Sequence, residues 1–231
     1  MTYVFPPRPQ PAIPITGSDE LYPIARIFCV GRNYADHAKE MGSEVDREAP
    51  WYFTKSAHAY CPSGVAVPYP PGTKNYHHEM EFAVALGGPA FDISTDQAMS
   101  AVFGYGAALD MTRRDRQQDG KDKRRPWSLG KDVENSAVIA PLTRAEEFGP
   151  VGAQRLHLDV NGQTRQDGTL ADMVWSVAEL ISHLSGYYHL GAGDVILTGT
   201  RAGVGPVNAR DVLKGEIEGL TPLSLTLTDA S

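Results

Sequence analysis

The sequence predicts a β-rich α+β fold with a few short peripheral helices. Short apolar runs recur along the 231 residues, and glycine- or proline-rich turns separate them, as is typical of sheet proteins. Helical periodicity is limited to a few short stretches. Because neither an internal repeat nor a linker divides the chain, we expect residues 21–231 to form one domain. Residues 1–20 are proline-rich and indicate an extended N-terminal arm, either packed on that domain or loose.

The first half of the chain carries mainly strand signals. ARIFCVGRN at 25–33 indicates a buried strand that ends at a glycine turn. NYADHAKEM at 33–41 indicates a helix, with Asn33 as its expected cap. Three further strand segments follow: WYFTKSA at 51–57, proline-rich edge-strand material at 62–72, and EMEFAVALGG at 79–88, which alternates in polarity before a Gly-Gly turn.

The second half adds two helices and the remaining strands. A helix capped near Ser94 or Thr95 is followed by a strand that runs into Asp110. QRLHLDVNGQTRQDG at 154–168 predicts a hairpin, because Asn161-Gly162 is a strong hairpin-turn signal. The last predicted elements are a helix over 176–187, a strand over 193–200 that enters the glycine-rich loop TRAGVGPVN, and a final strand within GLTPLSLTLTD at 219–229.

Composition narrows the possible classes of protein. The net charge of −7 argues against a nucleic-acid-binding protein. We see no apolar run long enough for a membrane span, and prolines occupy the N-terminal region where a signal peptide would carry its apolar helix. Cys29 and Cys61 lie in apolar or strand-like contexts, which favours two buried thiols over a disulfide. A cytoplasmic location is therefore expected.

Glu79 and Glu81 are the first candidate site. Residues i and i+2 of a strand point to the same face, so the two carboxylates lie side by side, with Ala83 and Ala85 continuing their face. Asp110 ends a later predicted strand and could be a third carboxylate. Carboxylates without His or Cys suit a hard cation such as Mg²⁺, Mn²⁺ or Ca²⁺. The alternative is an ordinary solvated strand face, which is the commoner origin of a bare Glu-x-Glu.

His37 and Glu40 are the second candidate site. They are three residues apart and share a helix face, and a carboxylate beside a histidine raises its basicity and orients its ring. Such a pair can activate water. A surface ion pair of little energetic value is the alternative.

The segment from Met111 to Lys131 is the third candidate. It contains eight basic and three acidic residues, a local balance of +5 in an acidic protein. Arg114 and Gln117 are three apart, and Lys131 follows a glycine, so these side chains could bind a carboxylate or a developing oxyanion. A solvated, salt-bridged surface is the alternative. The loop at 198–206 lacks the phosphate-loop pattern, and it could hold a carboxylate or be a plain turn.

In this order, the motifs resemble the fumarylacetoacetate hydrolase family. The matching stretches cover most of residues 25–228: VGRNYADHAKEM, FTKS, HHEMEFAVALG, GYGAALDMTRRDRQ, RPWSLGKD, VNGQTRQDG, DMVWSVAELISHLS and GDVILTGTRAGVGPV. They are most similar to the branch that hydrolyses fumarylpyruvate in bacterial gentisate degradation. The related acylpyruvases, which include oxaloacetate decarboxylases, share most of them.

The resemblance implies a mixed β-roll or sandwich, a homodimer, and Mg²⁺ or Mn²⁺ as cofactor, with Ca²⁺ as an ion that a crystal could contain. The implied roles are as follows: metal ligands Glu79, Glu81 and Asp110; catalytic residues His37, Glu40, Lys131 and Gln117; substrate-binding residues Arg32, Tyr34, Lys55, Arg114, Thr200 and Arg201. Two residues depart from the family pattern, because Arg201 and Ser56 stand where proline is usual. Arg201 lies beside the expected carboxylate site, so the departure concerns substrate identity.

The expected activity is metal-dependent hydrolysis of a 2,4-dioxo acid, with fumarylpyruvate, a small dianionic oxo acid, giving fumarate and pyruvate. His37, oriented by Glu40, is expected to take a proton from water, and its helix to close as a lid on a mobile loop at 42–48. Arg114 or Arg201 is expected to hold a terminal carboxylate. The alternatives are an oxaloacetate decarboxylase or other acylpyruvase, and a non-catalytic carboxylate- or metal-binding protein. His77 and His78 gain no catalytic role.

Overall fold

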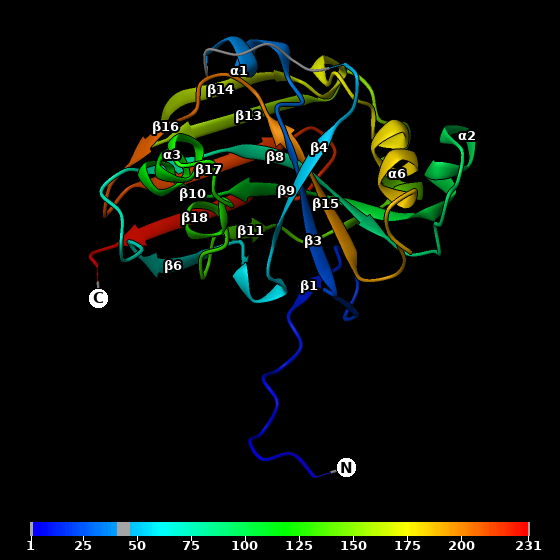
Figure 1. The fold of residues 1–231 in the computed structure, drawn as a ribbon, viewed down its shortest axis with the longest axis horizontal. Coiled ribbons are helices and arrows are strands. Elements are labelled where there is room, and N and C mark those ends of the chain that lie inside the picture. The colour runs from blue at the N-terminus through cyan, green and yellow to red at the C-terminus, as the bar shows by residue number, and fades with distance from the viewer. Residues whose placement is uncertain (1, 41–46, 231) are drawn as a thin grey trace.

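The computed structural model describes residues 2–40 and 47–230, except for the side chains of residues 38 and 39. Two curved sheets dominate it, and short helices lie around their edges (Figure 1). The predicted β-rich α+β fold is confirmed. The predicted mobile loop at 42–48 lies largely outside the described residues.

The larger sheet has eight strands. Seven strands follow one path, and an eighth, β12, pairs with β9. In spatial order they are β4 (Trp51–Lys55), β3 (Arg26–Gly31), β15 (Asp194–Thr200), β8 (Met80–Leu86), β9 (Val102–Asp110), β11 (Ala137–Ile139) and β5 (Tyr60–Pro62), with β12 (Thr143–Arg144) beside β9. The pairs β3–β15 and β11–β5 are parallel, and the others are antiparallel.

The second sheet has five strands, in the order β14 (Gln163–Thr169), β13 (Arg155–Val160), β17 (Val212–Ile217), β18 (Leu223–Thr228) and β6 (Val65–Pro68). Asn161 and Gly162 join β13 to β14 with φ of 53° and 74°, the left-handed pair of values that a type I′ hairpin turn requires. The predicted hairpin is therefore confirmed. The proline-rich strand β6 lies at the sheet edge, as predicted.

Two small sheets and the helices complete the fold. The small sheets are β10 (Thr112–Arg113) with β7 (Tyr76–His78) and β16 (Gly205–Val207), and β1 (Ala12–Pro14) with β2 (Leu21–Pro23). The helices are α1 (Ala35–Glu40), α2 (Thr95–Ala98), α3 (Arg114–Asp122), α4 (Ser128–Lys131), α5 (Ala145–Phe148) and α6 (Val177–Ser185), with 3₁₀ turns η1 (Ala57–Ala59), η2 (Met99–Ala101) and η3 (Leu170–Asp172). Ser176 and Glu179 form a capping box at α6, which stabilises that helix start by roughly 1 kcal/mol.

The hydrophobic core lies on both faces of the larger sheet. Met80, Phe82 and Val84 of β8 point into the cluster between the two large sheets, while Ala83 and Ala85 face a second cluster with Ile13 and Ile27. The predicted division of this strand into two faces is confirmed. Both cysteines are free and buried, also as predicted. No helix within the described ranges is long and apolar enough to cross a membrane.

The N-terminal arm differs along its length. Tyr3, Val4 and Phe5 are exposed, and this part of the chain extends away from the body (Figure 1). Ile13, by contrast, is fully buried, and its strand β1 pairs with β2. The proposed boundary at residue 20 therefore falls between two paired strands, and the division into arm and domain stays a proposal.

The expected cap of helix α1 is wrong. The helix begins at Ala35, and the Asn33 side chain is used elsewhere. Its amide nitrogen donates to the Trp175 and Thr198 carbonyl oxygens at 3.0 and 2.9 Å, and its oxygen accepts from the Trp175 amide at 2.7 Å. These contacts connect the turn after β3 to β15 and to the segment before α6, and no local sequence signal predicts them.

Candidate active site

Three carboxylates meet where strand β8 begins and its antiparallel neighbour β9 ends. Glu79 lies just before β8, Glu81 is within β8, and Asp110 ends the neighbouring strand β9. One oxygen from each lies within 4.8 Å of the others, and their exposed fractions are only 4%, 2% and 0%. The solvated strand face considered as an alternative is therefore excluded.

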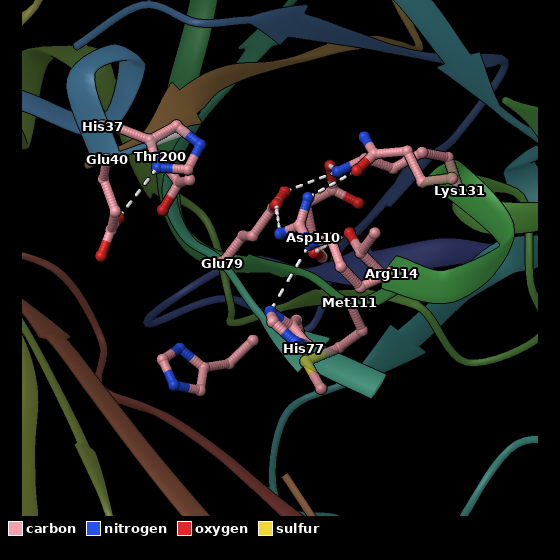
Figure 2. A network of polar contacts seen from close by, with 12 residues as sticks. His37, Glu40, His77, Glu79, Asp110, Met111, Arg114, Lys131 and Thr200 are labelled. Carbon is pink, nitrogen blue, oxygen red and sulfur yellow. Dashed lines mark hydrogen bonds and ion pairs between the residues drawn. The ribbon is translucent and has the colours of Figure 1, made fainter. Parts of the chain in front are cut away.

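Three cations contact Glu79 or Asp110, and Figure 2 shows two of them, Lys131 and Arg114. Lys131 Nζ lies 2.5 Å from Glu79 Oε2 and 2.6 Å from Asp110 Oδ2. Lys55 Nζ lies 2.9 Å from Asp110 Oδ1, and Arg114 forms an ion pair with Glu79 Oε1. The predicted basic segment is thus divided, because Arg114, Gln117 and Lys131 are buried in the site while its other basic residues are half-buried or exposed.

The three carboxylates are not electrostatically equivalent. Burial opposes the ionisation of Glu79, but the charges of Lys131 and Arg114 outweigh it, so the pKa of Glu79 is lowered. Burial, together with the charges of Asp110 and Glu79, raises the pKa of Glu81 well above its usual range. Its Oε2 accepts a hydrogen bond from the Gly199 amide at 2.8 Å.

The cluster fits a divalent metal ion. Its donors are buried carboxylate oxygens, which hard cations such as Mg²⁺ and Mn²⁺ prefer. Asp110 Oδ1 is buried and forms an ion pair with Lys55 Nζ at 2.9 Å, but it accepts no well-aligned hydrogen bond from the described residues, so a lone pair stays available for a cation. A cation here would also relieve the repulsion that raises the Glu81 pKa.

His37 and Glu40 lie beside the cluster on helix α1 (Figure 2). His37 Nδ1 is 3.4 Å from Glu40 Oε2, and the Gly203 amide donates to both Glu40 oxygens at 3.2 and 3.1 Å. His37 is 7% exposed, and burial lowers its pKa, although the nearby charge of Glu79 acts in the opposite direction. The imidazole is therefore held neutral near pH 7 and is able to accept a proton.

One cavity collects most of the predicted residues. Its lining includes nine of them: Arg32, His37, Glu79, Glu81, Asp110, Arg114, Gln117, Lys131 and Thr200. Glu40 and Lys55 do not line the cavity but contact residues that do. Glu40 contacts His37, and Lys55 contacts Asp110. Thr200 uses its hydroxyl within the protein, because it donates to the Met80 carbonyl at 2.7 Å and accepts from Gln166 Nε2 at 2.8 Å.

Tyr34 and Arg201 do not line the cavity. The Tyr34 side chain is 2% exposed, and its hydroxyl has no hydrogen-bond partner among the described residues. The Arg201 guanidinium packs on the backbone at Gly168, where an added Cβ would lie 1.3 Å from its NH1. Their predicted substrate contacts therefore stay proposals, without support from this arrangement.

Two further residues support the site: Gln166, which was missed in the sequence, and His77, to which the sequence assigned no catalytic role. Gln166, 1% exposed, accepts from the Met80 amide at 2.9 Å and donates to Thr200 Oγ1 and to the Arg201 carbonyl, both at 2.8 Å. His77 Nδ1 accepts from Arg114 Nε at 3.4 Å (Figure 2). Gln166 belongs to the predicted hairpin, but its partners are 34 or more residues away, and alternation within a strand gives no sign of them.

These features define a class: an enzyme in which a divalent-cation centre of carboxylates, a His–Glu pair and fixed cations share one cavity. The chain belongs to the fumarylacetoacetate hydrolase family, because the family described as "Fumarylacetoacetate (FAA) hydrolase C-terminal" matches residues 26–228. The predicted family resemblance is confirmed.

Individual relatives narrow the comparison. The chain is 47% identical over 193 residues to the fumarylpyruvate hydrolase of a Ralstonia species, covering 82% of this chain and all of that protein. It is 43% identical to the mitochondrial oxaloacetate tautomerase FAHD1 of Mus musculus, covering 85% of this chain and 89% of that protein. The crystal structure of fumarylpyruvate hydrolase from Pseudomonas aeruginosa, in complex with Mn²⁺ and pyruvate, superposes with a TM-score of 0.95 at 41% identity, covering 99% of this chain and 100% of that one.

Proposed function

We propose that this protein is a divalent-metal-dependent hydrolase that cleaves the C–C bond between the two carbonyl-bearing halves of a 2,4-dioxo acid. Fumarylpyruvate is the proposed substrate, and fumarate and pyruvate are the products. The observation that carries the proposal is the convergence of Glu79, Glu81 and Asp110 with His37 on one cavity. The Ralstonia and Pseudomonas relatives, which bear the name fumarylpyruvate hydrolase, support the choice of substrate.

His37 is the proposed base. Its neutral imidazole takes a proton from water, and the water oxygen adds to the carbonyl carbon distal to the keto acid. Glu40, fixed by the Gly203 amide, orients the ring and stabilises the imidazolium that forms. The C–C bond then breaks, its electron pair passes to the pyruvate enolate, and a proton completes pyruvate.

The remaining polar side chains provide fixed charge and hydrogen bonds. Arg114 NH1 donates to Gln117 Oε1 at 2.6 Å, which leaves the Gln117 amide nitrogen to donate to the oxygen of the tetrahedral adduct. Burial disfavours the charged form of Lys131, but Asp110 and Glu79 outweigh it and raise the Lys131 pKa, so this cation stays charged beside the site. A divalent cation held by Glu79, Glu81 and Asp110 would supply charge stabilisation for the departing enolate.

The direct test is an assay of purified protein with fumarylpyruvate, followed by the loss of its ultraviolet absorbance. We expect cleavage with Mg²⁺ or Mn²⁺, loss of activity after exhaustive EDTA treatment, and recovery when metal is returned. Stoichiometric fumarate and pyruvate should be found in the product mixture. Full activity in the EDTA-treated protein would contradict the metal requirement.

A second candidate function is enolisation or decarboxylation of oxaloacetate. The 43% identical mouse relative, which is named an oxaloacetate tautomerase, favours it. This chemistry needs enolate stabilisation but no attacking water, so it does not need His37 as a water-activating base. Parallel assays of both substrates with His37→Asn separate the two, because only hydrolysis should depend strongly on the histidine.

The proposal also covers the cellular location and the oligomeric state of the enzyme. We place it in the cytoplasm as a homodimer acting on a small dianionic oxo acid, which is the arrangement that the family resemblance implies. The dimer can be checked by sedimentation of the purified chain at micromolar concentration.

A further inference from the structure

Two cations in the cavity have no carboxylate partner among the residues that the structure describes. Arg32 and Lys121 are half-buried and line the same cavity as the carboxylate cluster. Lys131, Lys55 and Arg114 are all paired with Glu79 or Asp110, whereas neither Arg32 nor Lys121 forms an ion pair within the described part of the chain. Cations that are partly removed from water without an anion indicate a site for one.

An aromatic wall brings these two cations together. The rings of Trp51 and Trp127 contact edge to face with centroids 4.9 Å apart, and Phe53 lies 5.9 Å from Trp127. Arg32 lies over Trp51 at 5.9 Å, and Lys121 lies over Trp127 at 5.2 Å. The two charges therefore rest on adjoining rings that also line the cavity.

The backbone supports this arrangement at a cost. Arg32 has φ of 58°, the left-handed region that a residue with a long side chain rarely adopts. Gly31 allows Trp51 to lie on the strand, because a Cβ there would approach the Trp51 ring to 2.1 Å. Strain of this kind persists where the surrounding structure enforces it, and it is often found at binding sites.

Repulsion between neighbouring positive charges also disfavours the charged form of Lys121. Burial lowers the pKa of Lys121, and the charges of Arg114 and Arg32 lower it further. A bound anion would offset this repulsion. The other arginines that might hold a substrate carboxylate are already used or lie elsewhere, since Arg114 binds Glu79 and Gln117 and Arg201 packs at Gly168.

We propose that Arg32 and Lys121 bind the second carboxylate of the substrate, and that Trp51, Phe53 and Trp127 contact the planar unsaturated chain that leads to it. This inference rests on the proposed function and names its specificity determinant. The carboxylate cluster is almost fully buried, while Arg32 and Lys121 are half-buried, so the acyl chain would extend from the buried cluster toward the cavity mouth.

The subsite should select by chain length and charge. Fumarylpyruvate carries its second carboxylate beyond the second carbonyl and a C=C bond. Acetylpyruvate shares the bond that is cleaved but ends in a methyl group. Oxaloacetate is dianionic, but its second carboxylate lies one methylene from the ketone, too short to span the same length.

The test compares fumarylpyruvate with acetylpyruvate in matched variants. Lys121→Met and Arg32→Gln remove one charge each, and we expect kcat/KM for fumarylpyruvate to fall about 10- to 100-fold, mainly through KM. The loss with acetylpyruvate should be at least tenfold smaller. Lys123→Met, an exposed residue of the same basic segment, is the control, and Lys121→Arg should restore most of the selectivity. Equal losses on both substrates would overturn the proposal.

Binding gives a readout that does not depend on turnover. Calorimetry should show that wild-type protein binds fumarate at least tenfold more tightly than crotonate, which lacks the second carboxylate, and that Lys121→Met abolishes this preference. If the wild-type protein cleaves neither acylpyruvate, the proposed function fails, and the fumarate preference still decides the subsite. Equal affinity for fumarate and crotonate would rule the subsite out.

Discussion

The two large sheets differ in how deeply their polar side chains are buried. Every residue of β8 and β15 in the larger sheet is buried, whereas β13, β17 and β18 of the five-stranded sheet alternate between buried and more exposed positions. A polar residue in the first pair must find a partner inside the protein, as Thr198 does with the Phe82 carbonyl at 2.9 Å. In the second sheet, Lys214 and Glu216 simply face water. A polar residue on a strand that is buried on both faces is therefore a stronger candidate for a structural or catalytic role than one on a strand with a solvent-exposed face.

The largest effect should come from removing a buried carboxylate. We expect Glu79→Gln to lower kcat/KM roughly 1000-fold, because a metal ligand is lost and Arg114 and Lys131 lose part of their counter-charge. The same substitution at the exposed Glu216 should change neither activity nor Mn²⁺ affinity. Steady-state kinetics and Mn²⁺ calorimetry are measured on both variants. If Glu79→Gln kept the same kcat/KM and Mn²⁺ affinity as Glu216→Gln, the role of Glu79 as a metal ligand would be contradicted.

The proposed base should affect chemistry but not metal binding. His37→Asn is expected to reduce kcat about 100-fold, as is usual for loss of a general base, with Mn²⁺ affinity unchanged. His157→Asn in the five-stranded sheet, where the ring lies 3.1 Å from Asp159, provides a matched control with wild-type kcat. An unchanged kcat in His37→Asn would remove this histidine from the mechanism.

Activity should depend on pH through His37. Burial lowers its pKa, the charges of Glu79 and Glu40 raise it, and that of Arg114 lowers it, with a net shift below 6.5. The neutral form is the base, so kcat/KM should be constant above this pKa and fall about tenfold per pH unit below it. A pH–rate profile checks this, and residual activity of His37→Asn should lack the same acid limb.

The smallest effect concerns stability. Gln166→Leu leaves the Met80 amide and the Arg201 carbonyl without their partner, which should cost about 2 kcal/mol and lower Tm by roughly 4–8 °C. Gln163 is exposed on the same strand, so Gln163→Leu should leave Tm nearly unchanged. Scanning calorimetry of the two variants shows whether the loss of stability comes from the buried position of Gln166 or from replacing any glutamine by leucine.

Local patterns predicted much of the fold. Alternation in EMEFAVALGG gave the two faces of β8, Asn161-Gly162 gave the hairpin, and helical spacing gave α6. These features depend on neighbours in the chain. The spacing of Glu79 and Glu81 could not distinguish a wet face from a buried one, because that depends on what covers the strand.

The remaining features depend on contacts between distant residues. Asn33 looked like a helix cap, yet it binds Trp175 and Thr198 more than 140 residues away. Lys121 is one of eight basic residues in its segment, and only the folded cavity distinguishes it from exposed Lys123. Charge and polarity identified the right segments, but the tertiary structure selected the residues.

The parallel pairing of β3 with β15 has a consequence for how the chain folds. Its register places Arg26 opposite Asp194 and Cys29 opposite Leu197, so the centre of the larger sheet joins segments far apart in the sequence. At synthesis rates of about 5–20 residues per second, roughly 8–34 seconds separate the emergence of the two strands from the ribosome. During that interval β3 has an unpaired edge, which is open to pairing with other chains. Rapid synthesis or prompt chaperone binding should therefore raise the yield of native enzyme by shortening this exposure.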